Sequence, residues 1–227
     1  FSIFERHRTG NGLARPSYGE TMRTTKRFTP KVLARFVREA RGSGTYSDYI
    51  PWHRVSRGDP SSSGRSHLLM WRNRLRELLS DGELDKQLFA SMLVGVGLDD
   101  VLEQFPLSND DSQHILLRYG LQRDISLDKF PGTIGLAERL GIKHPKVREG
   151  GVTELWKPTT DFLLIFKSPS GSRQALAVAA KPNRSLTIRQ KQLLSLEREF
   201  WVVRGVPWLL ITPDLYDLRV ALTLRRI

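Results

Sequence analysis

Residues 161–182 read DFLLIFKSPSGSRQALAVAAKP, and this stretch decides the fold. Phe162–Phe166 is an apolar run of strand length, Ser168–Gly171 has the residues of a tight turn, and Ala175–Ala180 is a second apolar run. The pattern predicts a buried β-hairpin. Asp161 precedes its first strand and Lys181 follows its second, and an antiparallel return places those two ends side by side.

Further helices and strands are predicted on both sides of this hairpin. A long amphipathic helix is expected from about residue 186 to 204, stopped by Gly205 and followed by a strand over Val206–Thr212. Upstream, residues 80–93 predict a helix, and Val101–Phe105 predicts a strand closed by Pro106. Residues 107–140 are irregular at first and then weakly helical. Helix, hairpin, helix and strand in this order predict an α/β fold with a mixed central sheet flanked by helices.

The front of the chain predicts a helix and a basic strand. Thr29 is expected to cap a helix that has Pro30 at its first position, ends near Gly42 and buries a stripe. That stripe consists of Val32, Leu33, Phe36 and Val37. Leu68–Leu79 contains arginines at every second position, 72 to 76, and this spacing predicts one strand with a basic face.

The charge is concentrated in the same front third. The chain has a formal net charge of +12, and residues 1–80 hold 16 Lys and Arg against 6 Asp and Glu. Such a segment can neutralise several phosphates, so nucleic acid is the favoured partner over an anionic membrane. An ordinary solvated basic face is the alternative. The candidate DNA-contacting residues are Lys31, Arg35, Arg38, Arg41, Arg54, Arg65, Arg72 and Arg74.

Composition excludes several classes of protein and site. No stretch of about 18 apolar residues could span a membrane, and the absence of cysteine removes disulfides, thiolate metal sites and cysteine nucleophiles. We therefore expect a protein of the cytoplasm, and the start at Phe1 without a leader favours an ordered slice over a secreted precursor. The five histidines are far apart without metal-ligand spacing, and neither a Gly-rich phosphate loop nor a nucleophile elbow occurs.

Two carboxylates and one lysine remain as candidates for chemistry. Asp161 and Lys181 come together at the hairpin ends, and Glu83 could add a second carboxylate from a preceding helix. Carboxylate oxygens suit Mg²⁺, and a lysine beside the ion suits phosphodiester hydrolysis. Other interpretations stay open: Glu83 stands three residues after Ser80, as in a capping box, Asp161 could be a turn residue, and Lys181 an exposed strand end.

Several blocks of the sequence resemble, in order, the TnsA family, the endonuclease subunits of heteromeric bacterial cut-and-paste transposases. The similarity covers about residues 28–212. The blocks are Asp48–Trp52, Ser62–His67, Leu78–Asp81 with Glu83-Leu84, Glu103–Leu107, Gly141–Pro145, Thr160–Leu163, Lys181-Pro182, Leu196–Arg198 and Pro207-Trp208.

This resemblance implies a restriction-endonuclease-like core and Mg²⁺-dependent cleavage, with Mn²⁺ as a substitute ion. The expected reaction is a cut in the non-transferred strand at the 5′ ends of a transposon. It also implies three partners: transposon-end DNA, a DDE transposase, TnsB, and an AAA+ regulator, TnsC. Carried over residue by residue, Glu83 and Asp161 fall on the metal-binding acids and Lys181 on the catalytic lysine. Glu197 is a weaker match that would support the site from a helix.

Two departures from the family pattern stand out. The family has Gln two residues before the lysine, whereas this chain has Ala179, so only the backbone carbonyl of Ala180 can add a ligand there. Either this branch uses fewer side-chain ligands, with water completing the shell, or the alanine was introduced to stop cleavage. Only 15 residues follow Thr212, so the chain resembles the short form found with CRISPR-associated transposons.

The expected organisation has three parts. Residues 1–27 form a basic arm, 28–79 a basic DNA-contacting segment packed on the core, and 80–227 the restriction-endonuclease-like catalytic core. A catalytically inactive DNA-binding subunit of the same transposition complex is the alternative function. A stand-alone restriction-type nuclease is a third hypothesis.

Overall fold

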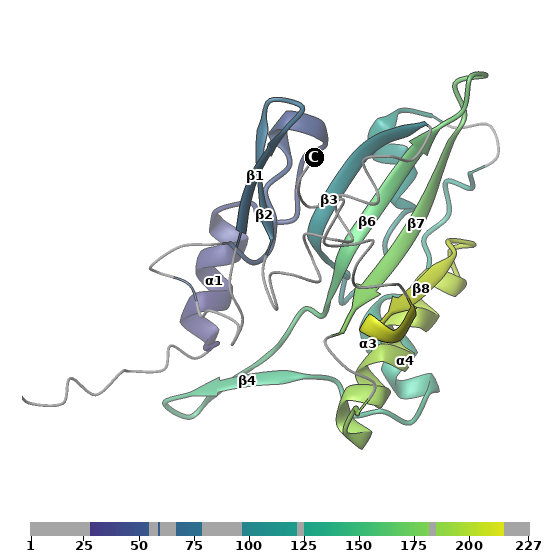
Figure 1. The fold of residues 1–227 in the computed structure, drawn as a ribbon. Coiled ribbons are helices and arrows are strands. Elements are labelled where there is room, and N and C mark those ends of the chain that lie inside the picture. The colour runs from purple at the N-terminus through teal and green to yellow at the C-terminus, as the bar shows by residue number, and fades with distance from the viewer. Residues whose placement is uncertain are drawn as a thin grey trace, which may run out of the picture.

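The computed structural model describes residues 28–54, 59, 67–78, 97–121, 125–181 and 185–215 (Figure 1). Its helices are α1 (Pro30–Arg38), α3 (Thr133–Arg139) and α4 (Ile188–Val202), and its 3₁₀ turns are η1 (Tyr46–Asp48), η2 (Ile115–Tyr119) and η3 (Pro213–Leu215). Its strands are β1 (His67–Trp71), β2 (Arg74–Leu78), β3 (Leu98–Pro106), β4 (Lys146–Glu149), β5 (Val152–Leu155), β6 (Thr159–Lys167), β7 (Arg173–Ala180) and β8 (Trp208–Ile211).

A four-stranded sheet forms the centre, in the order β3-β6-β7-β8. Strands β3, β6 and β7 are antiparallel to one another, whereas β8 runs parallel to β7 because α4 lies between them in the chain. The predicted hairpin is confirmed as β6 and β7. The α/β fold with a mixed central sheet is therefore confirmed as well.

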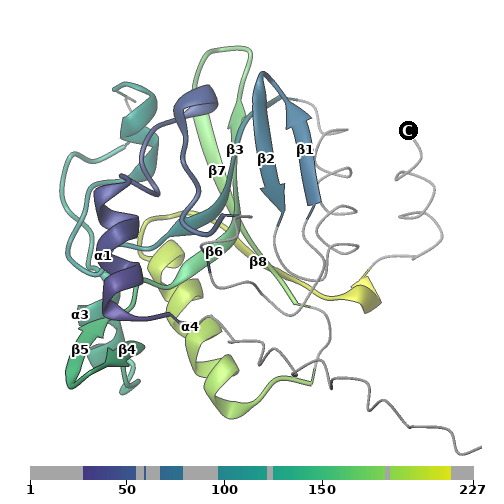
Figure 2. The same ribbon diagram turned by 90° about the vertical axis from the view of Figure 1, so that its left-hand side faces the viewer.

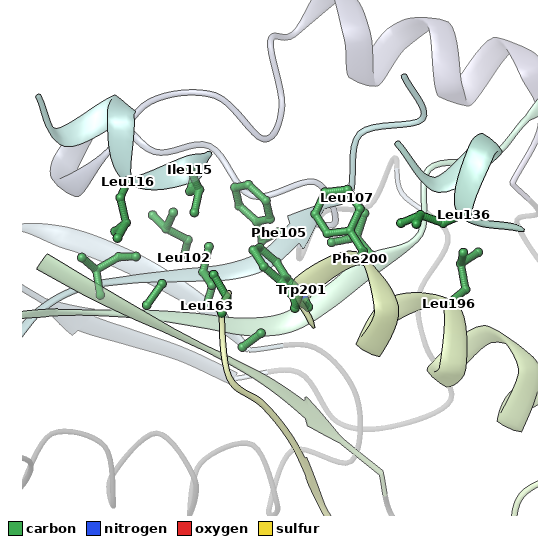
Figure 3. Packing of buried hydrophobic residues seen from close by; sticks show 14 of the residues in the cluster. Leu102, Phe105, Leu107, Ile115, Leu116, Leu136, Leu163, Leu196, Phe200 and Trp201 are labelled. Atoms are coloured by element: carbon green, nitrogen blue, oxygen red, sulfur yellow. The ribbon is translucent and has the colours of Figure 1, made fainter. Parts of the chain in front are cut away.

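Each face of this sheet has its own apolar core. On one face, Leu102 of β3 and Leu163 of β6 pack against Phe200 and Trp201 of α4 (Figure 3). On the other, Phe162 and its neighbours pack against Leu78 at the end of the β1–β2 hairpin (Figure 2). Because successive strand residues point to opposite faces, the continuous apolar runs of β6 and β7 supply both cores.

Helix α4 has the ends that its sequence predicts. The Thr187 hydroxyl accepts a hydrogen bond from the Gln190 backbone N–H (3.2 Å), and the Gln190 side chain accepts one from the Thr187 N–H (2.8 Å). This is a capping box. Gly205 follows the helix with φ +66°, a conformation that glycine adopts without strain. The helix therefore starts and stops where its polar and glycine residues dictate.

Helix α1 confirms its predicted start and corrects its predicted end. The Thr29 hydroxyl accepts from the Val32 N–H (3.3 Å), with Pro30 at the first position. The helix ends at Arg38 rather than near Gly42. At Gly42 the chain turns with φ +79°, and a Cβ there would lie 2.1 Å from the Pro106 Cγ. The early end leaves Val37 58% exposed, so the prediction that it is buried was wrong.

The single basic strand predicted over Leu68–Leu79 was wrong. This segment is the hairpin β1–β2, whose turn residues Arg72 and Asn73 both have positive φ angles. Arg74 and Arg76 point inward rather than outward, because β3 places the buried carboxylates of Glu103 and Asp100 beneath them. Two of the three hairpin arginines, Arg74 and Arg76, are therefore neutralised by carboxylates inside the protein.

Part of the fold was not predicted, and part lies outside the described residues. The antiparallel hairpin of β4 and β5 had no counterpart among the predicted elements. The helix expected over 80–93 and the basic arm over 1–27 lie outside the described residues. Among the described helices, none has the length and apolar character needed to cross a membrane.

Candidate active site

A notch opens where β6 and β7 separate. Their last paired residues at this end are Phe162 and Val178. Beyond that pair, β6 continues along β3 as far as Thr159, and β7 continues along β8 as far as Ala180. The two middle strands of the sheet thus part from each other, and backbone groups between them lose their ladder partners.

The Asp161 carboxylate fills this notch. One of its oxygens, Oδ2, accepts a hydrogen bond from the backbone N–H of Ala180 (2.8 Å) and one from the Lys181 ammonium (2.9 Å). The side chains of Asp161 and Lys181 are 17% and 29% exposed, so the pair lies partly open to solvent. The structure therefore brings together the two residues that the hairpin sequence singled out.

Gln104 of β3 is a third member of this cluster, and sequence reasoning missed it. Its Nε2 donates to the other Asp161 oxygen, Oδ1, at 3.3 Å. The residue is 8% exposed and has φ +50°, a strained conformation for a side chain of this kind inside a strand. Its position in the resembling block Glu103–Leu107 was the only available signal, and that block assigned it no role.

Glu197 of α4 faces the same notch from the helix side. Burial first, and then the negative charge of Asp161, raise the pKa of Glu197 to about 7 against the opposing effect of Lys181. The Trp208 indole N–H donates to its Oε1 (3.2 Å). A pocket of about 240 Å³ lies between Glu197, Lys181 and the ring of Trp156. The carboxyl group is thus buried beside Asp161, with an opening next to it.

This raised pKa predicts a pH-dependent stability in the absence of divalent metal. The folded chain holds the proton of Glu197 up to about pH 7, whereas an unfolded glutamate loses it near 4.5. Stability is therefore full below about pH 4.5 and falls as the pH rises to 7, by on the order of 3 kcal/mol. Glu197→Gln, which cannot ionise, should remove that loss.

The measurement is urea unfolding at pH 5 and pH 8 in EDTA, with Glu199→Gln as control. Glu199 lies two residues along the same helix, and its side chain is 27% exposed in an ion pair with Arg139. We expect Glu197→Gln to be more stable than the unmodified chain at pH 8, and the control to keep the original pH dependence. An unchanged pH dependence in Glu197→Gln would contradict the buried, protonated state.

The remaining predicted metal-site residues lie at the end of β7, beside Asp161, or outside the described residues. Ala179 is completely buried near the end of β7, and its methyl group has no oxygen to offer an ion. Ala180 is 5% exposed and follows it at the end of β7. Glu83, the second predicted carboxylate ligand, lies outside the described residues.

The donors in the notch match Mg²⁺ in type but are incomplete in number. The described residues contain no group of three His, Cys, Asp or Glu side chains that could hold a metal. Asp161 offers a partly exposed carboxylate, a hard oxygen donor of the kind Mg²⁺ prefers. The ion fits this chemistry if Asp161 is joined by the Ala180 carbonyl and by Glu83.

The predicted DNA-contacting cations are divided between surface and interior. Lys31 and Arg38 of α1 are exposed. Arg35 is half-buried and paired with Asp59 (2.5 Å), Arg54 pairs with Glu77 (2.9 Å), and Arg72 donates to the backbone oxygens of Leu98 and Asp99. Arg65 lies outside the described residues. The surface of this segment is thus less basic than its sequence.

Two of these arginines are buried in ion pairs. Arg41 is 8% exposed and lies between Asp59 (2.5 Å) and Glu39 (2.7 Å). Arg74 is 7% exposed and contacts both Glu103 oxygens at 2.6 Å. Both guanidinium groups neutralise internal carboxylates, so neither is part of the DNA contacts proposed below.

The described histidine side chains pack in the protein rather than form a metal site. His53 lies among the rings of Phe28, Phe36 and Trp156, and burial lowers its pKa to about 4. The His114 ring nitrogen contacts the backbone oxygen of Arg204 (3.1 Å), and that of His144 contacts the Thr133 hydroxyl (2.9 Å). The notch chemistry therefore rests on carboxylates and lysine.

Comparisons with known proteins identify the family that the chain resembles. The family described as TnsA-like endonuclease N terminal matches residues 119–213, which include Asp161, Lys181 and Glu197. The chain is 35% identical over 188 residues to the transposon Tn7 transposition protein TnsA of Escherichia coli. That alignment covers 82% of this chain and 58% of the relative, so the chain spans less than two thirds of the relative's length.

Proposed function

Because the chain belongs to the TnsA family of endonucleases and has its restriction-endonuclease-like fold, we propose that it cuts DNA at transposon ends. It acts as the endonuclease subunit of a heteromeric transposase and hydrolyses the non-transferred strand at the 5′ ends. The observation that carries this proposal is the Asp161–Lys181 pair in the notch where β6 and β7 part.

The proposed partners are those of the family resemblance. A DDE transposase of the TnsB type cuts the other strand, and an AAA+ regulator of the TnsC type couples cleavage to the choice of target. The substrate is duplex DNA at the transposon end, in the bacterial cytoplasm.

The contacts of Asp161 with the Ala180 N–H and the Lys181 ammonium support a hydrolytic role. They hold a carboxylate and a cation side by side, where the cation can stabilise negative charge that develops on a phosphate.

In the proposed mechanism Asp161, Glu83 and the Ala180 carbonyl would hold Mg²⁺. The ion would supply Lewis-acid activation of a water molecule near the scissile phosphate. Asp161 is held in place by the Ala180 N–H and the Gln104 amide, so its carboxylate needs little reorganisation. The Lys181 ammonium stabilises the negative charge that develops on the phosphate oxygens. Glu197 is buried near Asp161 and Lys181 and contributes to the electrostatic environment of both side chains without contacting the substrate.

The test uses purified chain, its partner transposase, end DNA and Mg²⁺. We expect a cut on the 5′ side of the transposon end, mapped to the nucleotide on a sequencing gel. A cut that needs no partner would indicate a stand-alone restriction-type nuclease. No cut under any condition, with transposition intact, would favour the inactive DNA-binding subunit.

The absence of a side-chain ligand at Ala179 is the observation that favours this alternative. Ala179→Gln separates the two functions. Under our proposal the unmodified chain already cuts, and water completes the ion's shell. Under the alternative only the Gln variant cuts, because the added amide oxygen restores a missing ligand.

Gln104 is expected to act as a positioning residue for Asp161. Gln104→Leu keeps its volume and removes the donor to Asp161 Oδ1, a hydrogen bond to a charged group worth about 1.5–3 kcal/mol. Cleavage should fall by roughly 10- to 100-fold with unchanged affinity for end DNA. Single-turnover cleavage and DNA-binding titrations measure the two effects, and Gln104→Asn provides a partial rescue. Equal losses of affinity and rate would contradict the role.

A further inference from the structure

The β4–β5 hairpin lies beside the candidate active site. It directly precedes β6, and its base is closed by a hydrogen bond from the Trp156 N–H to the Pro145 oxygen (2.9 Å). Pro145 and Trp156 also line the 240 Å³ pocket that Lys181 and Glu197 border. In Figures 1 and 2 the hairpin extends from the start of β6, next to one end of α1, which it contacts.

The register of this hairpin sorts its charges by face. Lys146 is paired with Leu155, and Arg148 with Thr153. Cross-strand partners share a face and successive residues alternate, so these four side chains form one face without an acid. The acids Glu149 and Glu154 belong to the opposite face, paired with Val152 and Val147. The hairpin has as many acidic as basic residues, yet all the charged side chains on this face are basic.

Two further cations belong to the segments next to the hairpin. Lys143 is exposed just before the hairpin, and Arg189 is half-buried in the first turn of α4. Burial lowers the pKa of His144, and the positive charges of Arg189 and Lys146 lower it further, which indicates that both cations lie near its ring. We name Lys143, Lys146, Arg148 and Arg189 the basic rim. None of the four forms an ion pair with another residue that the structure describes.

The basic rim differs in this respect from the basic front third of the sequence. There, Arg35, Arg41, Arg54 and Arg74 are all paired with carboxylates, and Lys31 and Arg38 stay exposed on α1. The long-range attraction of a paired cation for a phosphate is largely cancelled, whereas an exposed unpaired cation keeps it. On the hairpin itself, the one large apolar side chain of this face, Leu155, is half-buried, and Ile188 beside Arg189 is exposed. A single exposed apolar residue falls short of the apolar face by which amphipathic helices insert into a membrane.

We propose that the basic rim binds the phosphate backbone of duplex DNA beside the point of cleavage. This inference rests on the proposed function, because a scissile strand in the notch brings its flanking phosphates past the hairpin base. The β4–β5 hairpin is then an arm that holds the duplex, and Lys146 and Arg148 each contact a phosphate. The contacts are to the backbone and carry no base preference.

The experiment measures binding of the full chain to end DNA by fluorescence anisotropy over a range of salt concentrations, in EDTA so that no cleavage occurs. Lys146→Ala with Arg148→Ala should weaken binding at every salt concentration. It should also reduce the slope of log affinity against log salt by about 2, about 1 for each phosphate that the variant no longer neutralises. Glu149→Gln with Glu154→Gln, on the other face of the same hairpin, is the matched control and should keep the original slope.

The outcomes separate this inference from the proposed function. A Lys146→Ala/Arg148→Ala protein that is folded by circular dichroism and binds with unchanged affinity and slope would overturn the inference, even if the unmodified chain cuts DNA. The inference also fails if the control variant weakens binding equally, or if the unmodified chain binds no duplex at low salt. Rim-dependent binding by a chain that never cuts DNA would support the rim and reject the nuclease.

Discussion

Asp161→Asn is expected to reduce DNA cleavage by at least about 10³-fold while DNA binding is retained. The substitution keeps the shape of the side chain but removes the carboxylate that would hold the ion and that pairs with Lys181 at 2.9 Å. Metal-assisted charge stabilisation is worth several kcal/mol in a transition state, and each ~1.36 kcal/mol is a tenfold change in rate. Single-turnover cleavage of end DNA with the partner transposase measures the effect.

Asp128→Asn is the control for the loss of one negative charge at a site away from the notch. Asp128 is exposed and accepts a hydrogen bond from the neighbouring Ser126 hydroxyl, so Asp128→Asn should cut at the original rate. Thermal unfolding checks that both variants are folded. If Asp161→Asn cuts DNA as fast as the unmodified chain, the notch is not the catalytic site and the proposed function fails.

Glu103→Ala is expected to destabilise the fold by about 3–5 kcal/mol, the largest stability effect that the structure predicts. Glu103 is 1% exposed, and its two carboxylate oxygens each accept a hydrogen bond from a terminal nitrogen of Arg74 at 2.6 Å. Arg76 forms a longer ion pair with it at 3.4 Å. Burial raises the pKa of Glu103 to about 6, although Arg74 opposes that shift. Its removal takes the ion-pair partner from the buried Arg74 guanidinium and leaves Arg76 with Asp100 alone. Removing one partner of a buried ion pair is costly because it leaves a buried charge without compensation.

The control for this prediction is the exposed ion pair of Arg139 and Glu199. Their atoms are also close, at 2.8 Å, but the two side chains are 53% and 27% exposed. Glu199→Ala should therefore cost less than about 1 kcal/mol, because water screens the pair. Urea unfolding of both variants measures the difference. Equal and small losses would show that β3 does not depend on the charge of Glu103.

The hairpin and its two end residues were predictable because strand and turn signals are local. The apolar runs, the Ser-Pro-Ser-Gly turn and the antiparallel return suffice to bring Asp161 to Lys181. The Thr29 cap of α1 and the Gly205 stop of α4 were predictable for the same reason, since both act on backbone groups within a few residues. No part of these predictions needed knowledge of a distant contact.

The inward arginines of β2 and the contact from Gln104 were not predictable in this way. Arg74 looked like a surface cation until β3 placed Glu103 beneath it, 29 residues away in the chain. Gln104 reaches Asp161 across a strand pair separated by 57 residues, from a backbone conformation that no sequence pattern announces. In both cases a partner from a remote strand decides which way a polar side chain points.

The amino-acid sequence by itself determined the strand–turn–strand unit, the start of α1, the stop of α4 and the pairing of one aspartate with one lysine, because short-range backbone and apolar preferences set them. Only the tertiary structure decided which cations face solvent. A guanidinium group turns inward wherever the fold buries a carboxylate beside it and stays outside where none is near, so Arg74 is neutralised in the interior while Lys146 and Arg148 remain on the surface.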